Sequence, residues 1–286
     1  MGIGAEGDAT SRGNDRWRAK RLFAGVAVAA AFALTTVTCG NDEESRHLEG
    51  PPKGVPVLPD LVPEPPIDLQ TKHEVSGAWS MRFSSTLVNV GEADFILHGD
   101  RVGDHWVVEQ QVAFSESGSE LRPTDADIVW GGDGHDHWHV KRVATYRIEA
   151  VDDAGTPMSG GGGRSDTKVG FCFFDSHKKL DGGPKKAQYK REGCGKETDT
   201  QFLMGLSPSW GDVYDITLPG QSVDITDLPD GRYRIWAEAD PQGWFTEVTR
   251  DNNVTWADVK LSTRPADGLR VAVIVGTGPT PAPISH

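Results

Sequence analysis

A strictly alternating segment near the C-terminal end most constrains what this chain can fold into. Residues 231–239 read Gly-Arg-Tyr-Arg-Ile-Trp-Ala-Glu-Ala, and the two-residue period of a β-strand places Tyr233, Ile235 and Ala237 on one face. A second strand-like run follows at residues 253–261, and no window of the chain sustains a helical period for long. The two runs therefore predict a pair of neighbouring strands.

Other parts of the chain alternate in the same way. We expect further strands at residues 79–90, 93–97, 105–114 and 140–150. The 34 Gly and 18 Pro among 286 residues indicate many turns. Two stretches with little periodicity, residues 117–134 and 175–212, are expected as long loops. The sequence thus predicts an all-β fold, an antiparallel β-sandwich with long irregular loops.

The N-terminal segment carries the pattern of an export signal. Four basic residues between Arg16 and Arg21 precede an uncharged apolar run from residue 22 to residue 38. The run ends at Cys39, before the acidic residues 42–44. Residues 1–45 are therefore predicted to be a signal peptide or a lipoprotein signal and anchor. The protein would be extracytoplasmic, either secreted or attached to the cell envelope through the N-terminus or a lipidated Cys39.

The remaining organisation follows from composition. Residues 46–68 are rich in proline and are expected to form an extended linker. One folded domain is predicted from residue 69 to residue 272, followed by a flexible tail at residues 273–286. With Cys39 set aside, Cys172 and Cys194 remain. In an exported protein they form either one disulfide bridge or two free buried thiols.

The charge balance limits the partners. A formal net charge of −13 excludes a polyanion such as DNA as a suitable partner and draws cationic ligands towards the protein. One stretch, residues 175–195, is nevertheless rich in basic residues and is interpreted as solvated surface charge. Its basic residues are Lys178, Lys179, Lys185, Lys186, Lys190 and Arg191.

The strongest local signal is the run Gly-His-Asp-His-Trp-His at residues 134–139. On a strand, His135, His137 and His139 face one side, and neutral imidazole is a ligand for copper, zinc, iron or nickel. A straight strand would separate the outer two α-carbons by about 13 Å, near the limit for sharing one ion. The preceding glycines would let the backbone bend. The pattern predicts a transition-metal site, with a surface His-rich patch as the alternative, and does not choose the metal.

This histidine run resembles the copper-binding segment of the lysyl oxidase family. Further segments are similar to that family in the same order, at residues 82–95, 168–172, 205–214, 224–233 and 252–254. The resemblance extends from Arg82 to Leu261. Two departures are that Gly134 stands where the animal enzymes have a cysteine, and that residues 175–195 are longer than their counterpart.

The resemblance implies a copper-dependent amine oxidase. His135, His137 and His139 would hold copper(II), and Tyr214 would be oxidised there and cross-linked to Lys168 as lysine tyrosylquinone. Primary amines or lysine-containing proteins would react with O2 to give aldehyde, hydrogen peroxide and ammonia. From the net charge, cationic diamines or exposed lysines are the expected substrates.

Several readings stay open from the residues themselves. The catalytic base is one of Asp133, Asp136 and Asp212, and Asp136 would point away from the histidines on a regular strand. A non-catalytic extracytoplasmic β-sandwich that serves in adhesion or metal binding is the main alternative function. A zinc hydrolase is a further alternative, but the sequence has no His-Glu-x-x-His arrangement.

Overall fold

The computed structural model describes residues 51–131, 135–158, 164–167 and 170–282. The chain divides into two units, residues 1–46 and 47–286, and every described residue belongs to the second. The predicted signal or anchor segment therefore lies outside the described residues. Among the residues that are described, no helix has the length and apolar character needed to cross a membrane.

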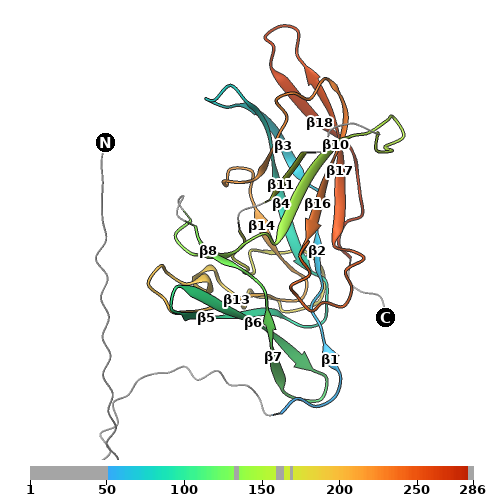
Figure 1. The fold of residues 1–286 in the computed structure, drawn as a ribbon. Coiled ribbons are helices and arrows are strands. Elements are labelled where there is room, and N and C mark those ends of the chain that lie inside the picture. Colours follow the sequence, from blue (N-terminus) through green and yellow to red (C-terminus); the bar gives the residue numbers. More distant parts are fainter. Residues whose placement is uncertain (1–50, 132–134, 159–163, 168–169, 283–286) are drawn as a thin grey trace, which may run out of the picture. The chain divides into compact units, whose positions relative to one another are not determined.

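The described chain consists of four antiparallel sheets (Figure 1). The first contains β1 (Pro56–Val57), β6 (His105–Phe114), β5 (Phe95–Val102) and β13 (Gln201–Leu206), with β7 (Ser119–Thr124) paired to β6. The second contains β11 (Arg164–Thr167), β10 (Ala144–Ala150), β16 (Gly231–Ala239), β17 (Val254–Thr263) and β18 (Arg270–Thr277).

The third sheet is built around the long strand β4 (Trp79–Asn89). Its other strands are β12 (His177–Lys178), β14 (Trp210–Tyr214), β15 (Ser222–Asp224), β2 (Leu61–Pro63) and β3 (Ile67–His73). A two-stranded sheet joins β8 (Ile128–Trp130) to β9 (Trp138–Val140). The one helical element in the described ranges is a short 3₁₀ turn, η1 (Arg191–Cys194). The all-β prediction is confirmed.

The sheets pack across a shared hydrophobic core. Phe83 of β4 and Tyr146 of β10 meet edge to face with ring centroids 4.8 Å apart, and the Tyr146 hydroxyl donates a hydrogen bond to Ser85 Oγ at 2.7 Å. Phe95 of β5 packs in the same way against Phe173. The first contact joins the sheets of β4 and β10, and the second packs the sheet of β5 against the segment after β11. Residues far apart in the sequence therefore meet in one core, as a sandwich requires.

The Pro-rich segment departs from its prediction as a linker. Within residues 46–68, strand β2 pairs with β4 through Leu61, Val62 and Pro63, and Leu61 is fully buried. The folded part therefore begins before residue 69, because short edge strands tolerate proline where its missing N–H is not needed. At the other end, β18 extends to Thr277 and pairs with β17, so part of the predicted tail, up to Thr277, is strand.

The two predicted loops also contain strands. Residues 117–134 include β7 and β8, and residues 175–212 include β13 and most of β14. Strand β13 pairs with β5 over six residues, and β14 pairs with β4. Gly and Pro interrupt the alternation in these stretches, but pairing with β6, β5 and β4 determines the conformation of β7, β13 and β14.

Candidate metal centre

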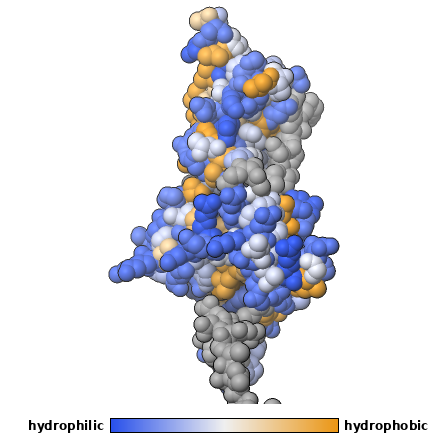
Figure 2. Space-filling model, turned by 90° about the vertical axis from the view of Figure 1, so that its left-hand side faces the viewer, coloured by the Kyte–Doolittle hydropathy of each residue, from blue (hydrophilic) through white to orange (hydrophobic). Residues whose placement is uncertain are grey.

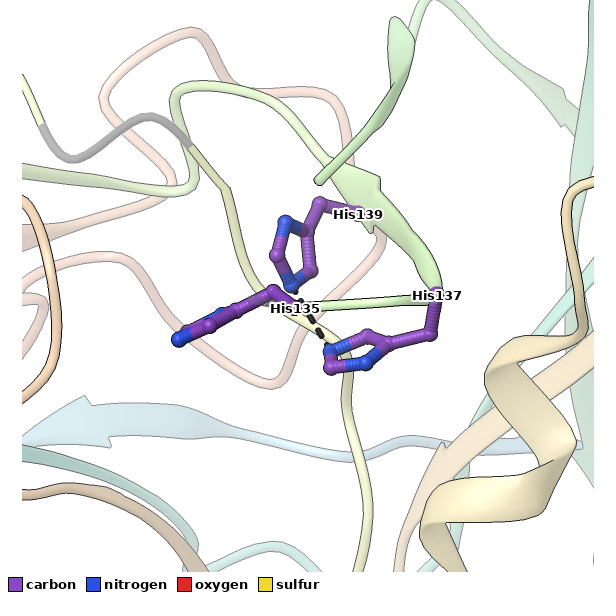
Figure 3. A group of neighbouring side chains, drawn as sticks. All are labelled: His135, His137 and His139. Carbon is purple, nitrogen blue, oxygen red and sulfur yellow. Dashed lines mark hydrogen bonds between the residues drawn. The ribbon is translucent and has the colours of Figure 1, made fainter. Parts of the chain in front are cut away.

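A tight turn brings the three histidines together. The backbone N–H of His137 donates to the carbonyl of His135 at 2.7 Å, and the N–H of Gly131 donates to the carbonyl of His137 at 3.1 Å. Only His139 lies on a strand, β9. One nitrogen from each of the three rings lies within 4.8 Å of the others, and Figure 3 shows the His137 and His139 rings pointing towards one another. The turn removes the separation that a straight strand would impose.

Two glycines make room for the His139 ring. A methyl group on Gly131 would lie 2.6 Å from His139 Cε1, and one on Gly170 would lie 2.3 Å from His139 Cβ. Both distances are far below a normal carbon–carbon contact. The His139 side chain therefore packs closely against two backbone segments, and only glycine fits at these positions.

Burial keeps the His137 imidazole in the form that binds metals. His137 and His139 are buried, and His135 is half-buried. Burial, with help from the positive charge of Arg191, lowers the pKa of His137 to about 4. The ring is then neutral at physiological pH, which is the ligand form of histidine. His137 Nε2 and His139 Nε2 are 2.8 Å apart.

Tyr214 lies in the core beside the backbone that leads to this cluster. Its hydroxyl accepts a hydrogen bond from the N–H of Cys172 at 2.7 Å, and its ring packs on Phe171 with centroids 4.4 Å apart. Burial raises the pKa of Tyr214 well above its usual value, and the neighbouring Asp212 carboxylate adds to the rise. Tyr214 is therefore a phenol at neutral pH.

The segment of residues 170–172 connects the histidine cluster to Tyr214. Gly170 packs on His139, Phe171 exchanges two backbone hydrogen bonds with Val140 next to His139, and Cys172 contacts Tyr214. Lys168 lies outside the described residues. In the sequence it precedes Gly170 by two positions.

A disulfide bridge holds the other side of this segment. Cys172 and Cys194 are bonded and both are fully buried, which confirms the bridge and excludes the two free thiols. Cys194 ends η1, and Arg191 at the start of η1 places Nη2 3.3 Å from His137 Nδ1. The bridge therefore links the backbone next to Tyr214 to a residue that touches a histidine of the cluster.

Several neighbours of the site were not singled out in the sequence. Trp106 and Trp130 each pack edge to face on Trp138, with centroids 5.0 and 5.1 Å away, and the Arg101 guanidinium lies 5.6 Å from the centroid of the Trp138 ring. They come from β6, β8 and β5, which are distant in sequence. In the sequence, the Trp-His pair at residues 138–139 was the only local sign that aromatic rings pack beside the histidine cluster.

The two candidate bases that the structure describes differ in burial. Asp136 is exposed, and Asp133 lies outside the described residues. Asp212 is fully buried on β14, two residues before Tyr214. Among the described candidates, only Asp212 is enclosed beside the tyrosine.

The fold and the cluster define a class, the all-β proteins with a cluster of three histidines that could hold a metal ion. The sequence profile of the Lysyl oxidase family matches residues 109–268. The match covers more than half of the chain and includes the histidine cluster, Tyr214 and both bridged cysteines. The chain belongs to the lysyl oxidase family.

The relatives share modest identity with this chain. A protein-lysine 6-oxidase from Sus scrofa is 25% identical over 216 residues, which are 72% of this chain and 77% of that protein. Lysyl oxidase homolog 2 from Gallus gallus is 28% identical over 137 residues, 48% of this chain and 16% of that protein. A protein-lysine 6-oxidase from Bos taurus is matched over 46% of its length. The chain therefore spans well under two thirds of some of these relatives.

Proposed function

We propose that the protein is a copper-dependent amine oxidase that deaminates primary amines or peptidyl lysine to aldehydes. O2 is consumed, and hydrogen peroxide and ammonia are released. The observation that carries the proposal is the short segment of residues 170–172, which touches His139 at one end and Tyr214 at the other. Membership of the lysyl oxidase family supports it.

The donor set fits copper(II). His135, His137 and His139 would hold the ion, and imidazole nitrogen suits copper. Two nitrogens that each bind one ion at about 2.0 Å are roughly 2.8–3.3 Å apart, depending on geometry. The His137 and His139 Nε2 atoms, at 2.8 Å, are close enough to bind one ion together.

The surroundings of Tyr214 fit a cofactor made from the chain itself. Tyr214 and Lys168 would be cross-linked as lysine tyrosylquinone. Such a quinone is an electrophile that reacts with primary amines and takes up their electrons. Phe171 and the buried core exclude water from the Tyr214 ring, and the N–H of Cys172 provides a hydrogen-bond donor at its oxygen.

We assign proton transfer to Asp212. A base for this reaction must take a proton from the α-carbon of the amine, and a carboxylate works best near neutral pH when burial raises its pKa. Asp212 is fully buried near Tyr214, whereas Asp136 is exposed to solvent. Asp212→Asn should therefore suppress turnover without preventing copper binding.

An extracytoplasmic location belongs to the same proposal. The buried Cys172–Cys194 bridge is the kind of bond that persists in oxidising compartments. The basic and apolar N-terminal pattern that ends at Cys39 supports export. Labelling with a fatty acid distinguishes the two alternatives. A protein attached through a lipidated Cys39 would incorporate the label, and a secreted protein would not.

The test is to express the full chain with copper and assay for a protein-bound quinone. We expect a positive redox-cycling stain, a coloured phenylhydrazine adduct and peroxide release with a primary amine. Lys168→Ala and Tyr214→Phe should each abolish all three signals while the protein still binds copper. Unchanged quinone and peroxide in both variants would refute the mechanism.

Metal analysis separates the alternatives. Stoichiometric copper in the purified protein supports the oxidase, and stoichiometric zinc with no quinone supports the hydrolase. A copper-loaded protein that forms no quinone and oxidises no amine would leave the non-catalytic adhesion or metal-binding module.

A further inference from the structure

Gln221 is a buried polar residue next to the backbone of Tyr214. Hydrophilic residues dominate the described part of the face drawn in Figure 2, and glutamine is mostly exposed in proteins. Gln221 is nevertheless 0% exposed. It stands directly before β15 and seven positions after Tyr214. A fully buried amide is an exception whose hydrogen bonds need an account.

The Gln221 amide donates two hydrogen bonds at the strand that carries the tyrosine. Its Nε2 atom is 3.2 Å from the carbonyl oxygen of Tyr214 and 2.7 Å from Ser85 Oγ. Ser85 lies directly opposite Tyr214 in the pairing of β14 with β4, and the side chains of such a pair lie on the same face. One amide therefore ties both strands together at the position of the tyrosine.

A second phenol joins this contact from another sheet. The hydroxyl of Tyr146 on β10 donates to Ser85 Oγ at 2.7 Å. Burial raises the pKa of Tyr146 well above its usual value, and the charge of Asp212 adds to the rise, so this hydroxyl keeps its proton. Ser85 thus accepts two hydrogen bonds, one from Tyr146 and one from Gln221. These contacts connect β10, β4 and the backbone of β14.

The loop after Tyr214 keeps Gln221 in place. The N–H of Ile216 donates to Ser84 Oγ at 3.0 Å. The N–H of Phe83 donates to the carbonyl of Gln221 at 3.2 Å. Both partners belong to β4, the strand that also pairs with β14. The side chain of Gln221 therefore starts from a backbone that is fixed to the same strand as the tyrosine.

The acceptor of the same amide is left without a partner. Gln221 Oε1 is enclosed and accepts no hydrogen bond within the part of the chain that the structure describes. An unpaired buried acceptor costs free energy. A methionine would fill a similar volume without this cost, so a space-filling role does not account for a glutamine. The position needs the two donors of Nε2.

We propose that Gln221 is a positioning residue that fixes the cofactor tyrosine, so that the Tyr214 ring keeps one orientation relative to the histidine cluster. The inference deepens the proposed oxidase function and rests on it. Gln221 acts through the backbone of Tyr214 and through Ser85, and takes no part in the chemistry itself. A displacement of reacting groups by about 1 Å can slow a reaction by about a hundredfold, so such a restraint affects the rate.

Tyr214 is held from two sides. Its ring packs on Phe171, with centroids 4.4 Å apart, and on the other side its carbonyl accepts the hydrogen bond from Gln221. The segment of residues 170–172 that includes Phe171 also packs on His139. The two restraints together therefore fix the tyrosine relative to the histidine cluster, and the loss of Gln221 removes one of them.

The test follows the formation of the cofactor in Gln221→Met. Copper and O2 are added to the metal-free full-length protein, and the quinone is followed by its absorbance and by the redox-cycling stain. We expect the quinone to form about tenfold more slowly than in the unaltered protein. The copper content should stay the same, because the histidines are not changed.

Gln110→Met is the matched control. Gln110 on β6 is 1% exposed, and its amide makes two hydrogen bonds to the backbone of Thr246, at 2.7 and 2.8 Å. This variant loses as many hydrogen bonds as Gln221→Met, so its melting temperature should fall at least as far. The quinone should nevertheless form at the unaltered rate.

A double variant separates positioning from general destabilisation. Tyr146→Phe removes one hydroxyl from the same set of contacts and should also slow quinone formation. When it is combined with Gln221→Met, the slowing should be smaller than the product of the two single effects, because both side chains act through Ser85. Combined with Gln110→Met, the two effects should simply multiply.

A second measurement needs no cofactor. The amide of Cys172 donates to the Tyr214 hydroxyl, so its hydrogen exchange in metal-free protein reports whether the ring stays in place. Exchange at Cys172 should be faster in Gln221→Met than in Gln110→Met. Unaltered quinone formation together with unaltered exchange in Gln221→Met would overturn this inference alone. An unaltered protein that forms no quinone with copper would contradict the proposed function, and the exchange at Cys172 would still decide whether Gln221 positions Tyr214.

Discussion

Gly170→Ala tests whether the segment of residues 170–172 sets the geometry of the metal cluster. The added methyl carbon would lie 2.3 Å from His139 Cβ and 2.9 Å from its Cγ. A carbon–carbon contact needs about 3.5 Å, so either His139 or the segment must move by about 1.2 Å. Metal–ligand distances tolerate only about 0.2 Å. We therefore expect copper affinity to fall by at least about tenfold, as when the support of a ligand is lost.

The affinity is measured by chelator competition on the purified protein, and thermal unfolding of the metal-free protein reports the cost to the fold. Gly231→Ala is the control, because its methyl group would meet only Tyr233 at an ordinary 3.6 Å. It should keep full affinity. If Gly170→Ala binds copper as tightly as the unaltered protein, His139 is not held by this segment and the reasoning fails.

Three further predictions concern stability. Replacing Cys172 and Cys194 together by alanine should lower the free energy of unfolding by about 3 kcal/mol in urea titrations, as expected for a loop with a sequence separation of 22. Burial raises the pKa of Glu247 to about 7, so its protonation stabilises the fold below about pH 4.5 and this contribution is lost as the pH rises through 7. In EDTA, the free energy of unfolding of Glu247→Gln should lack that part of the pH dependence. Tyr214→Phe should cost about 1 kcal/mol in urea titrations, since the N–H of Cys172 loses its partner.

The regular strands could be read from the sequence because apolar and polar residues alternate along them, and in β6 and β16 burial alternates in the same way. The alternation at residues 79–90, 105–114 and 231–239 corresponds to β4, β6 and β16, which are central or long strands. The short strands β2, β13 and β14 could not be found in this way. Strands β2 and β14 are buried almost throughout and lack alternation, and β13 alternates over only four residues. The conformation of all three depends on partners distant in the chain.

The histidine cluster could be located but its geometry could not. Three histidines at two-residue spacing indicated a shared site, whereas the turn that unites them depends on Gly131 and on Gly170 from another segment. Arg191 was visible only as one of several basic residues. Its contact with His137 depends on the disulfide that positions η1, and nothing in the local pattern distinguishes it from its solvated neighbours.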